Sequence, residues 1–292
     1  MLIGAHVSVA GGYENGLEYG AQVGAECIQI FAKSPRQWVG PPIDAEKAAR
    51  FVALRDERGF GPVFTHTAYL INLSTDDGVL WEKSMHALAD ELARGSLLGA
   101  AGVVTHIGND PAGDPAAAAE RVGEAVRRAF ELAGGEACRT RLLLENTAGA
   151  GRSFGADFEQ LAAVVSAAEL PSDRLGVCID TCHAFAFGYA LDTAEGWREL
   201  VDGIAGCCGI DRLGLVHAND CLYERGSKRD RHAWIGDGHI GRAGFEAMVC
   251  VPELADVCAC TEMPGEVPIK DAENLARLKA MRRECAPSQE SR

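Results

Sequence analysis

The 292-residue sequence lacks long apolar runs and cysteine pairs with zinc-ribbon or thioredoxin-type spacing. Its most apolar run, residues 97–105, is far shorter than the roughly 20 residues of a membrane span, so no membrane-spanning segment is predicted. No C-x-x-C pair occurs, which argues against a zinc ribbon or a thioredoxin-type site. The first residues, MLIGAHVSVAGG, have no basic start and no cleavage site, and they indicate a first strand rather than a signal peptide.

Basic residues are also scarce, because 28 Lys and Arg stand against 42 Asp and Glu, for a net charge of −14. This balance argues against broad adhesion to nucleic acid through a basic surface, but it leaves room for a local basic groove and for bound cations. The eleven cysteines belong to a long chain with ample apolar residues, and several fall inside apolar runs, where thiols pack as small hydrophobes. We therefore expect reduced cysteines and a cytoplasmic protein.

One pattern recurs along the chain: a short apolar run, a polar residue at its end, and then an amphipathic helical stretch. The eight predicted strands are Leu2–Ser8, Cys27–Ala32, Val63–Thr67, Val103–Ile107, Leu142–Asn146, Leu175–Asp180, Leu213–His217 and Val257–Glu262. Alternating strands and helices predict parallel βαβ units, and eight of them predict a closed (β/α)₈ TIM barrel, with a doubly wound open sheet as the alternative. We expect one domain over residues 1–284 and a disordered tail over residues 285–292.

Acidic and histidine side chains stand at six of the predicted strand ends and in the segment after the seventh strand. They are His66, His106, Glu145, Asp180, His183, His217, Asp230, His232 and Glu262. A single residue of this kind usually packs or lies at the surface, but the C-terminal ends of barrel strands converge on one face, where active sites sit. Nitrogen and oxygen donors suit Zn²⁺, Mn²⁺ or Fe²⁺, and nine donors are too many for one ion, which predicts a cluster of two or three metals.

The stretch GVCIDTCHAF, residues 176–185, leaves two interpretations of this site. Cys178 and Cys182 would make it a thiolate site, whereas Asp180 and His183 would make it an oxygen and nitrogen site with packing cysteines. The donors at the other strand ends favour the second interpretation. A metal cluster of this kind lowers the pKa of a bound water from 15.7 toward about 7 and holds the attacked group and the leaving oxygen, which suits phosphate ester hydrolysis.

The motifs IGAHVSVAGG, HTAYLINL, ENTAG, GVCIDTCHAF, HAND, DRHAWIGDGHIG and TEMPG closely resemble those of endonuclease IV, the apurinic/apyrimidinic endonuclease family 2 of base excision repair. The resemblance covers nearly the whole chain and implies a (β/α)₈ barrel with three zinc ions, for which Mn²⁺ or Fe²⁺ could substitute. It assigns His66, His106 and Glu145 to the first ion, and Glu145, as a bridge and catalytic residue, with Asp180, His217 and Glu262 to the second. His183, Asp230 and His232 would hold the third.

The resemblance also implies a substrate and a product. The enzyme would cleave duplex DNA 5′ to an abasic site, leaving a 3′-hydroxyl and a 5′-deoxyribose phosphate, and would trim blocked 3′ ends as a monomer. Arg36, Tyr69 and Leu70 match positions that enter the minor groove while the abasic nucleotide is flipped out, and unstacking is cheapest where a base is already missing. The alternative for these three residues is core packing or a solvated loop.

Further cations lie near the predicted mouth and could form a local phosphate-binding rim, namely Lys33, Arg36, Arg225, Lys228, Arg229 and Arg231. The chain departs from the family pattern at HIGND after His106 and at Cys221 and Leu222 after the HAND motif. His6, at the end of the first strand, is expected beside the ligands.

Two other functions compete with the endonuclease prediction. A xylose-isomerase-like sugar isomerase or epimerase shares the architecture, but it uses one or two metals and has no use for the Asp230–His232 pair. A non-catalytic barrel that binds damaged DNA or stores metal would not need a complete, open set of ligands.

Overall fold

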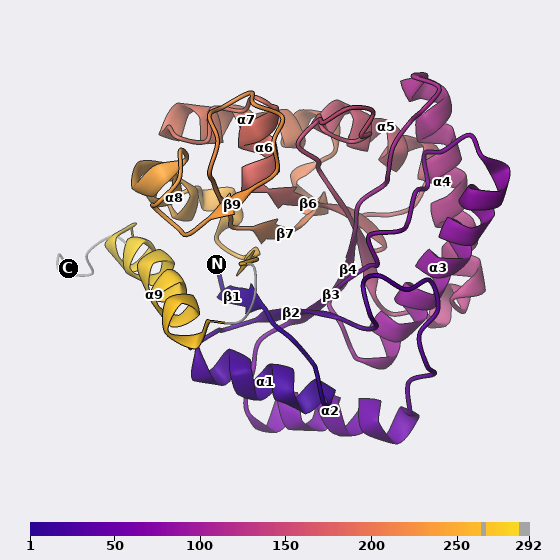
Figure 1. Ribbon diagram of the computed structural model, residues 1–292, viewed down its shortest axis with the longest axis horizontal. Helices are drawn as coiled ribbons and strands as arrows, with labels where there is room; N and C mark the ends of the chain where they lie inside the picture. Colours follow the sequence, from indigo (N-terminus) through magenta and orange to yellow (C-terminus); the bar gives the residue numbers. More distant parts are fainter. Residues whose placement is uncertain (264–266, 286–292) are drawn as a thin grey trace.

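Eight parallel strands close into a barrel in the computed structural model, which describes residues 1–263 and 267–285 (Figure 1). The strands are β1 (Ile3–His6), β2 (Ile28–Phe31), β3 (Val63–His66), β4 (Gly102–Thr105), β5 (Arg141–Glu145), β6 (Leu175–Asp180), β7 (Leu213–His217) and β10 (Cys258–Thr261). Around the barrel the order is β1-β10-β7-β6-β5-β4-β3-β2, and pairing of β1 with β2 completes the circle. Each strand lies within or overlaps one predicted run, so the predicted (β/α)₈ barrel is confirmed.

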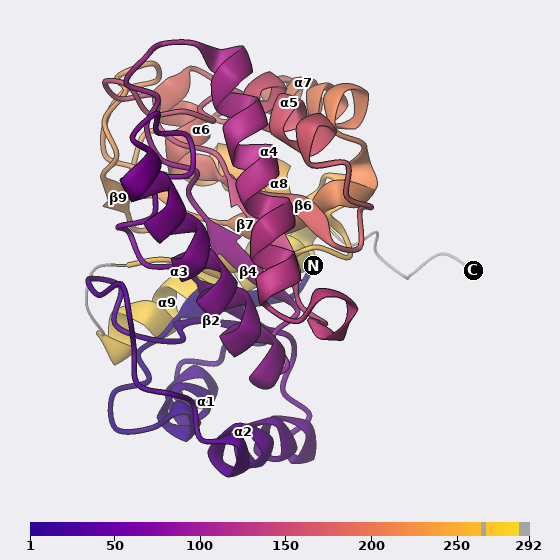
Figure 2. The same cartoon turned by 90° about the vertical axis from the view of Figure 1, so that its right-hand side faces the viewer.

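Helices surround the strands on the outside (Figures 1 and 2). They are α1 (Tyr13–Gln22), α2 (Ala45–Glu57), α3 (Gly78–Leu97), α4 (Pro115–Leu132), α5 (Phe158–Ala168), α6 (Thr181–Phe187), α7 (Ala194–Cys207), α8 (Gly241–Val249) and α9 (Pro268–Cys285), with 3₁₀ turns η1 (Gly135–Ala137), η2 (Ile210–Arg212) and η3 (Pro252–Leu254). Asp44, Asp77, Asp114 and Asp157 cap α2 to α5 through their carboxylates. Among the described residues, no helix combines the length and apolarity that crossing a membrane requires.

The inside of the barrel is filled by a small, separate cluster of buried side chains, half of them cysteines. Its members are Cys27, Phe64, Val104, Leu143, Cys178, Leu215, Cys258 and Cys260. Alternate residues of a strand point to the same side of the sheet. These residues, and those two positions away in the same strand, therefore face into the barrel. The thiols in this cluster pack as small apolar groups, as the apolar runs indicated.

The first strand is joined to the last helix by the carboxylate of Glu26. Arg282 on α9 donates to both of its oxygens, at 2.7 and 2.9 Å, and the backbone N–H of Ile3 donates to Oε2 at 2.8 Å. Lys279 adds a second cation, 3.6 Å away. These contacts fix α9 beside β1, next to the point where the barrel closes.

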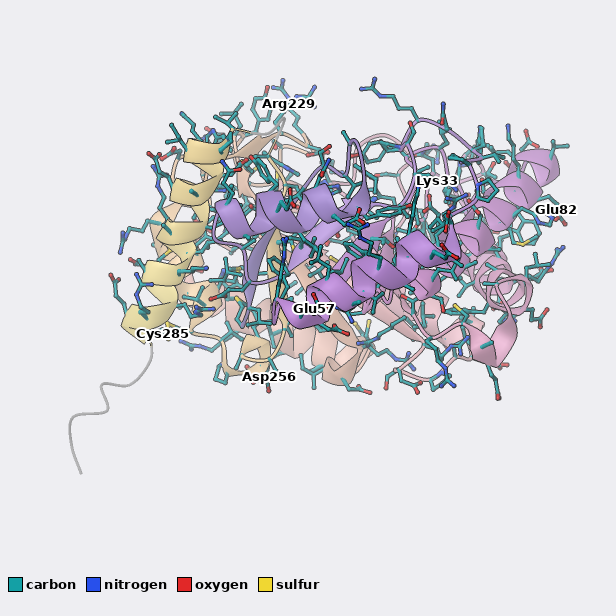
Figure 3. All side chains as sticks on the ribbon, turned by 90° about the horizontal axis from the view of Figure 1, so that it is seen from below. Lys33, Glu57, Glu82, Arg229, Asp256 and Cys285 are labelled. Carbon is teal, nitrogen blue, oxygen red and sulfur yellow. A yellow bond between two sulfur atoms is a disulfide. The ribbon has the colours of Figure 1, made fainter. Side chains whose placement is uncertain are left out.

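A disulfide joins Cys250, which caps α8, to Cys285, the last residue of α9, with 5.5 Å between their Cα atoms. The prediction that all the cysteines are reduced is therefore wrong for this pair, because packing of α8 against α9 brings together thiols that lie 35 residues apart. Figure 3 places Cys285 and Asp256 at the end of the barrel opposite Arg229. Residues 286–292 of the predicted disordered tail lie outside the described residues.

A two-stranded antiparallel sheet, β8 (Asp220–Cys221) and β9 (His232–Ala233), follows β7 and was not predicted. The carboxylate of Asp220 accepts hydrogen bonds from four amides of the next loop, those of Gly236, Gly238, Ile240 and Gly241, at 2.9 to 3.3 Å. A Cβ atom at Gly238 would lie 2.5 Å from Asp220 Oδ1, so only glycine allows this approach. The anchored loop holds β9, and with it His232, beside the barrel mouth.

Candidate metal centre

A ring of polar side chains lies directly above the apolar filling of the barrel. In seven of the eight strands, each ring residue lies two residues beyond an inward-facing residue of the apolar cluster. Phe64 is followed by His66, for example, and Leu143 by Glu145. The ring comprises His6, Gln29, His66, His106, Glu145, Asp180, His217 and Glu262. The two-residue period of the strands therefore turns eight separate stretches of sequence into one layer at the C-terminal mouth.

Three further donors reach this layer from beyond the strands. His183 lies in the first turn of α6, directly after β6, while Asp230 and His232 follow from the loop before β9 and from β9 itself. The structure thus brings all nine residues predicted as metal ligands to the same mouth.

The nine donors divide into three groups in which the ligand atoms lie within 4.8 Å of one another. In the first group, His66 Nε2 and His106 Nε2 lie 3.1 and 3.5 Å from Glu145 Oε2. In the second, His217 Nδ1 lies 3.0 Å from the other oxygen of Glu145, Oε1, and 3.2 Å from Glu262 Oε2. Glu145 therefore directs one oxygen into each group, as a bridging carboxylate would.

Asp180 completes the second group, its Oδ2 lying 3.9 Å from His217 Nδ1. In the third group, Asp230 lies between two imidazoles, with Oδ2 3.3 Å from His183 Nε2 and Oδ1 3.4 Å from His232 Nε2. The partition of donors matches the one that the sequence resemblance implied.

Backbone carbonyls fix the tautomers of three of these histidines. Nδ1 of His66, His183 and His232 lies 2.8 to 2.9 Å from the carbonyl oxygens of residues 67, 146 and 262 respectively. A carbonyl can only accept, so Nδ1 carries the proton and the lone pair of the neutral ring is on Nε2. Nε2 of His66 faces Glu145, and Nε2 of His183 and of His232 faces Asp230, while Nδ1 of His183 also lies 3.4 Å from Glu145 Oε1.

The ionised carboxylates of the site also favour the binding of cations. Burial alone would raise the pKa of Glu145 and of Glu262, but the neighbouring histidines hold both pKa values well below the usual range, so both carboxylates are ionised at neutral pH. Asp230 is also ionised, because its bond with His183 outweighs burial and lowers its pKa to about 2. Within the described ranges, the ion-pair partners of Glu145 and Glu262 are histidines rather than Lys or Arg.

Two ring nitrogens of the predicted ligands have no hydrogen-bond partner. His106 Nδ1 and His232 Nε2 are both buried and make no hydrogen bond, and burial lowers the pKa of His106 to about 4, so that its ring is neutral. An unpaired buried nitrogen is costly unless it binds something. Imidazole nitrogens and ionised carboxylates are the donors that Zn²⁺ takes, and the three groups of residues fit such ions.

Two amide side chains that were not predicted hold the ligands in place. Gln29, fully buried on β2, accepts from His217 Nε2 at 2.9 Å and donates to Glu262 Oε1 at 2.7 Å. Asn219 donates to Asp180 Oδ2 at 2.7 Å and to Glu262 Oε2 at 3.2 Å. The signal for Asn219 was its place in the HAND motif. The signal for Gln29 was its position two residues after Cys27.

His6 lies beside the ligands, as expected, with Nδ1 3.0 Å from Gln29 Nε2 and 3.3 Å from Glu262 Oε1. Cys178 faces into the barrel beneath the ring and belongs to none of the donor groups. Cys182 differs, because its sulfur lies within 4.8 Å of ligand atoms of Asp180 and His232. The sequence indicated packing alone for this thiol, but the structure places it among the donors.

The donors open into a cavity of about 810 Å³ that is also lined by Arg36, Tyr69 and Arg231. The ring of Tyr69 is 64% exposed and lies edge-on to Phe31 at 5.5 Å, which excludes the alternative of core packing for Tyr69. Its backbone N–H donates to Pro35 O at 3.1 Å, so the loops that carry Arg36 and Tyr69 are joined. Leu70, next in the chain, is half-buried.

The cations expected at the rim differ in their availability. Lys33 is buried and pairs with Asp90 Oδ2 at 2.7 Å and with Glu91 Oε1 at 3.3 Å, so its charge is already neutralised. Arg229 lies at the mouth end of the barrel, its guanidinium 3.6 Å from the ring centroid of Tyr223. Lys33 therefore does not belong to a phosphate-binding rim, because carboxylates of α3 hold it.

Comparison with known proteins places the chain in a family. Residues 17–283 match the family described as xylose isomerase-like TIM barrel. The chain is 39% identical to a probable endonuclease 4 of Methanoculleus marisnigri, over 96% of this chain and 99% of that protein. It is 41% identical to a probable endonuclease 4 of Oleidesulfovibrio alaskensis, over 96% of this chain and 95% of that one.

Solved structures agree with this assignment. The crystal structure of endonuclease IV from Thermus thermophilus superposes with a TM-score of 0.86 at 39% identity, covering 97% of this chain and 100% of that one. A D-tagatose 3-epimerase-like protein has a TM-score of 0.72 at 19% identity, over 97% of this chain and 99% of that one, which shows a shared fold alone. The chain is a member of the endonuclease IV family.

Proposed function

We propose that this protein is a zinc-dependent phosphodiesterase that cleaves duplex DNA 5′ to abasic sites, leaving a 3′-hydroxyl and a 5′-deoxyribose phosphate. The observation that carries the proposal is the bridging position of Glu145, whose two oxygens face two separate donor groups 3.0 to 3.5 Å away. The printed names of the relatives, endonuclease 4 and endonuclease IV, support a nuclease. Trimming of blocked 3′ ends at the same site, and action as a cytoplasmic monomer, are part of the proposal.

When bound, zinc ions would supply a nucleophilic water at neutral pH and would neutralise charge on the phosphate. Glu145 would fix the spacing of the first two ions, with Asp180, His217 and Glu262 completing the second site. His183, Asp230 and His232 would hold a third ion at the outer side of the cavity. The burial of Glu145, Asp180 and His217 excludes bulk water from the inner part of the site and strengthens these charge interactions.

The residues at the mouth would select a flipped, baseless nucleotide. The exposed ring of Tyr69 and the half-buried Leu70 offer an apolar wedge beside the metal ligand His66, whose ring centroid lies 5.9 Å from that of Tyr69. Arg36 lines the same cavity and would contact the phosphate backbone. Such a wedge offsets the cost of unstacking, and that cost is lowest where a base is missing.

A duplex with one tetrahydrofuran abasic analogue tests the proposal. The zinc-loaded protein should nick the strand 5′ to the analogue in buffer that contains EDTA. Glu145→Gln should lower this rate by about a thousandfold or more, because an amide cannot bridge two cations. Glu131→Gln, on an exposed helix position, is the matched control and should nick normally.

Metal analysis separates this proposal from a sugar isomerase or epimerase. The endonuclease proposal requires about three zinc ions per chain, one of them held by the His183, Asp230 and His232 group, whereas the isomerase alternative has no third ion. Near-normal cleavage by Glu145→Gln would show that the bridging role is wrong. Absence of cleavage by a protein that carries three zinc ions would contradict the proposed function itself.

A further inference from the structure

Two thiols lie directly behind the third donor group. Cys182 is in the first turn of α6 and Cys221 is in β8, and both are fully buried. The two thiols interact with each other, and Cys182 Sγ donates to the carbonyl of Arg231 at 3.6 Å.

Cys182 shares its surroundings with two predicted metal ligands. Its sulfur, a carboxylate oxygen of Asp180 and a ring nitrogen of His232 all lie within 4.8 Å of one another. His232 donates through Nδ1 to the carbonyl of Glu262, which leaves the buried, unpaired Nε2 as the donor atom. A sulfur, a nitrogen and an oxygen therefore converge on one point.

Cys221 approaches the same point from the other side. It is the direct partner of His232 in the antiparallel pairing of β8 with β9, so the two side chains project from the same face of this sheet. Cys221 thus brings a second thiol to the side of His232, outside the Asp180–Cys182–His232 group itself.

We propose that Asp180, Cys182 and His232 form a site for a thiophilic divalent cation such as Cd²⁺, with Cys221 as a supplementary donor. Thiolates prefer soft cations over hard ones, and binding would release the proton of each coordinating thiol to solvent without any change of oxidation state. The site overlaps the third donor group, because His232 has only Nε2 to give. A cation held at Cys182 would therefore deprive the His183–Asp230–His232 group of one ligand.

This overlap has a functional consequence that rests on the proposed function. Cd²⁺ bound at Cys182 would inhibit DNA cleavage by competing for His232 of the third group and for Asp180 of the second, while leaving the first group of donors intact. The binding of Cd²⁺ to Cys182 does not itself depend on the proposed DNA cleavage.

Other thiols that could bind Cd²⁺ have to be replaced before the measurement. Cys207 and Cys208 lie 3.5 Å apart at the surface, with Cys207 exposed, and would bind Cd²⁺ on their own. The experiment therefore uses the full zinc-loaded chain with Cys207→Ser and Cys208→Ser as the background. Cys138→Ser is the matched control, since Cys138 is a buried thiol that bonds Leu92 O and belongs to no donor group.

Cd²⁺ is added to the background protein, and the thiolate-to-cadmium ultraviolet absorption is recorded together with nicking of the abasic duplex. Cys182→Ser should abolish most of the absorption and raise the Cd²⁺ concentration that halves nicking by about tenfold or more, because a hydroxyl is a poor ligand for a soft cation. Cys221→Ser should produce a smaller shift in the same direction. Nicking without Cd²⁺ should stay unchanged in both variants, and Cys138→Ser should match the background in every measurement.

Equal absorption in Cys182→Ser and the background would overturn the proposal. If Cys182→Ser does not fold, as judged by its thermal unfolding, Cys182→Ala provides the same comparison with an apolar side chain in the buried position. Absorption that depends on Cys182 in a protein that does not nick abasic DNA would contradict the proposed function and leave the site standing. Normal nicking with absorption independent of Cys182 would contradict the site alone.

Discussion

The side-chain oxygen of Gln29 accepts a hydrogen bond from His217 Nε2 at 2.9 Å. This bond fixes the tautomer of His217 and directs its Nδ1 atom at Glu145 and Glu262. His217 would thus bind a metal through Nδ1, and a neutral amide from another strand decides this.

Replacing Gln29 by Leu should weaken zinc binding by the second donor group and leave zinc binding by the third group unchanged. The ring of His217 loses the acceptor that orients it and Glu262 loses a donor, so the affinity of the second group for zinc should fall by about 10- to 100-fold. Zinc content after dialysis against a graded chelator measures this effect. The His183–Asp230–His232 group is the internal control, and an unaltered zinc content would show that Gln29 only fills space.

Removal of the metal should destabilise the fold. Without cations, the ionised carboxylates of Glu145, Glu262 and Asp230 repel one another at the barrel mouth. Ligand at a thousandfold excess over its Kd contributes about 4 kcal/mol, so zinc should raise the Tm of the metal-free protein by roughly ten degrees. Mg²⁺ should not replace zinc, because it prefers an octahedral shell of oxygens. Equal Tm values with and without zinc would mean that the cluster does not hold metal.

Glu26 should make the stability depend on pH in acid. Burial alone would raise its pKa, but the bonds from Arg282 and from the Ile3 N–H lower it to about 2. The unfolded chain has the ordinary Glu value, so the contribution is complete above that value and is lost as the pH falls toward 2. Glu26→Gln should cost about 1 kcal/mol at pH 7, after allowance for solvent screening.

The free energy of unfolding in urea at several pH values measures this cost. The difference between Glu26→Gln and the unmodified chain should shrink as the pH falls through the range from about 4.5 to 2, and metal loss in acid affects both proteins alike. Glu57→Gln, at the exposed end of α2, is the control. A difference that stays constant across this pH range would argue that Glu26 contributes through packing.

The disulfide between Cys250 and Cys285 closes a segment of 35 residues. Cross-linking a loop of this length restricts the unfolded chain by about 3–4 kcal/mol, so Cys250→Ser should lower the free energy of unfolding by that amount in non-reducing buffer. Reductant should lower the stability of the unmodified chain to that of the variant, and Cys207→Ser should behave as the unmodified chain does. Nicking should be unaffected, because the disulfide lies at the end of the barrel opposite the mouth. Equal stabilities without reductant would show that the two thiols are not joined.

The sequence allowed the barrel and the nine donors to be predicted because both depend on local patterns. A run of alternating strands and helices predicts the fold, and a charged residue such as Glu145 or His217 at a strand end stands out against the apolar run before it. Gln29 occupies the same layer, yet a neutral amide carries no such contrast. Its role could be recognised only from the alignment of Cys27 with the other inward-facing residues.

Contacts between distant segments could not be predicted in this way. The neutralisation of Lys33 depends on Asp90, from α3, three elements later in the chain, and the Cys250–Cys285 disulfide depends on how α8 packs against α9. The approach of Cys221 to Cys182 likewise follows from the pairing of β8 with β9. Tertiary packing alone determines these pairs.

Restoring zinc stepwise to the metal-free protein, and measuring cleavage of an abasic duplex at each step, tests the central claim most directly. We expect little cleavage at one equivalent and full cleavage only as the zinc content approaches three per chain. The labelled strand should then end in a 3′-hydroxyl on the 5′ side of the lesion, which a DNA polymerase extends. Full activity with a single zinc ion, or no cleavage with three, would contradict the account.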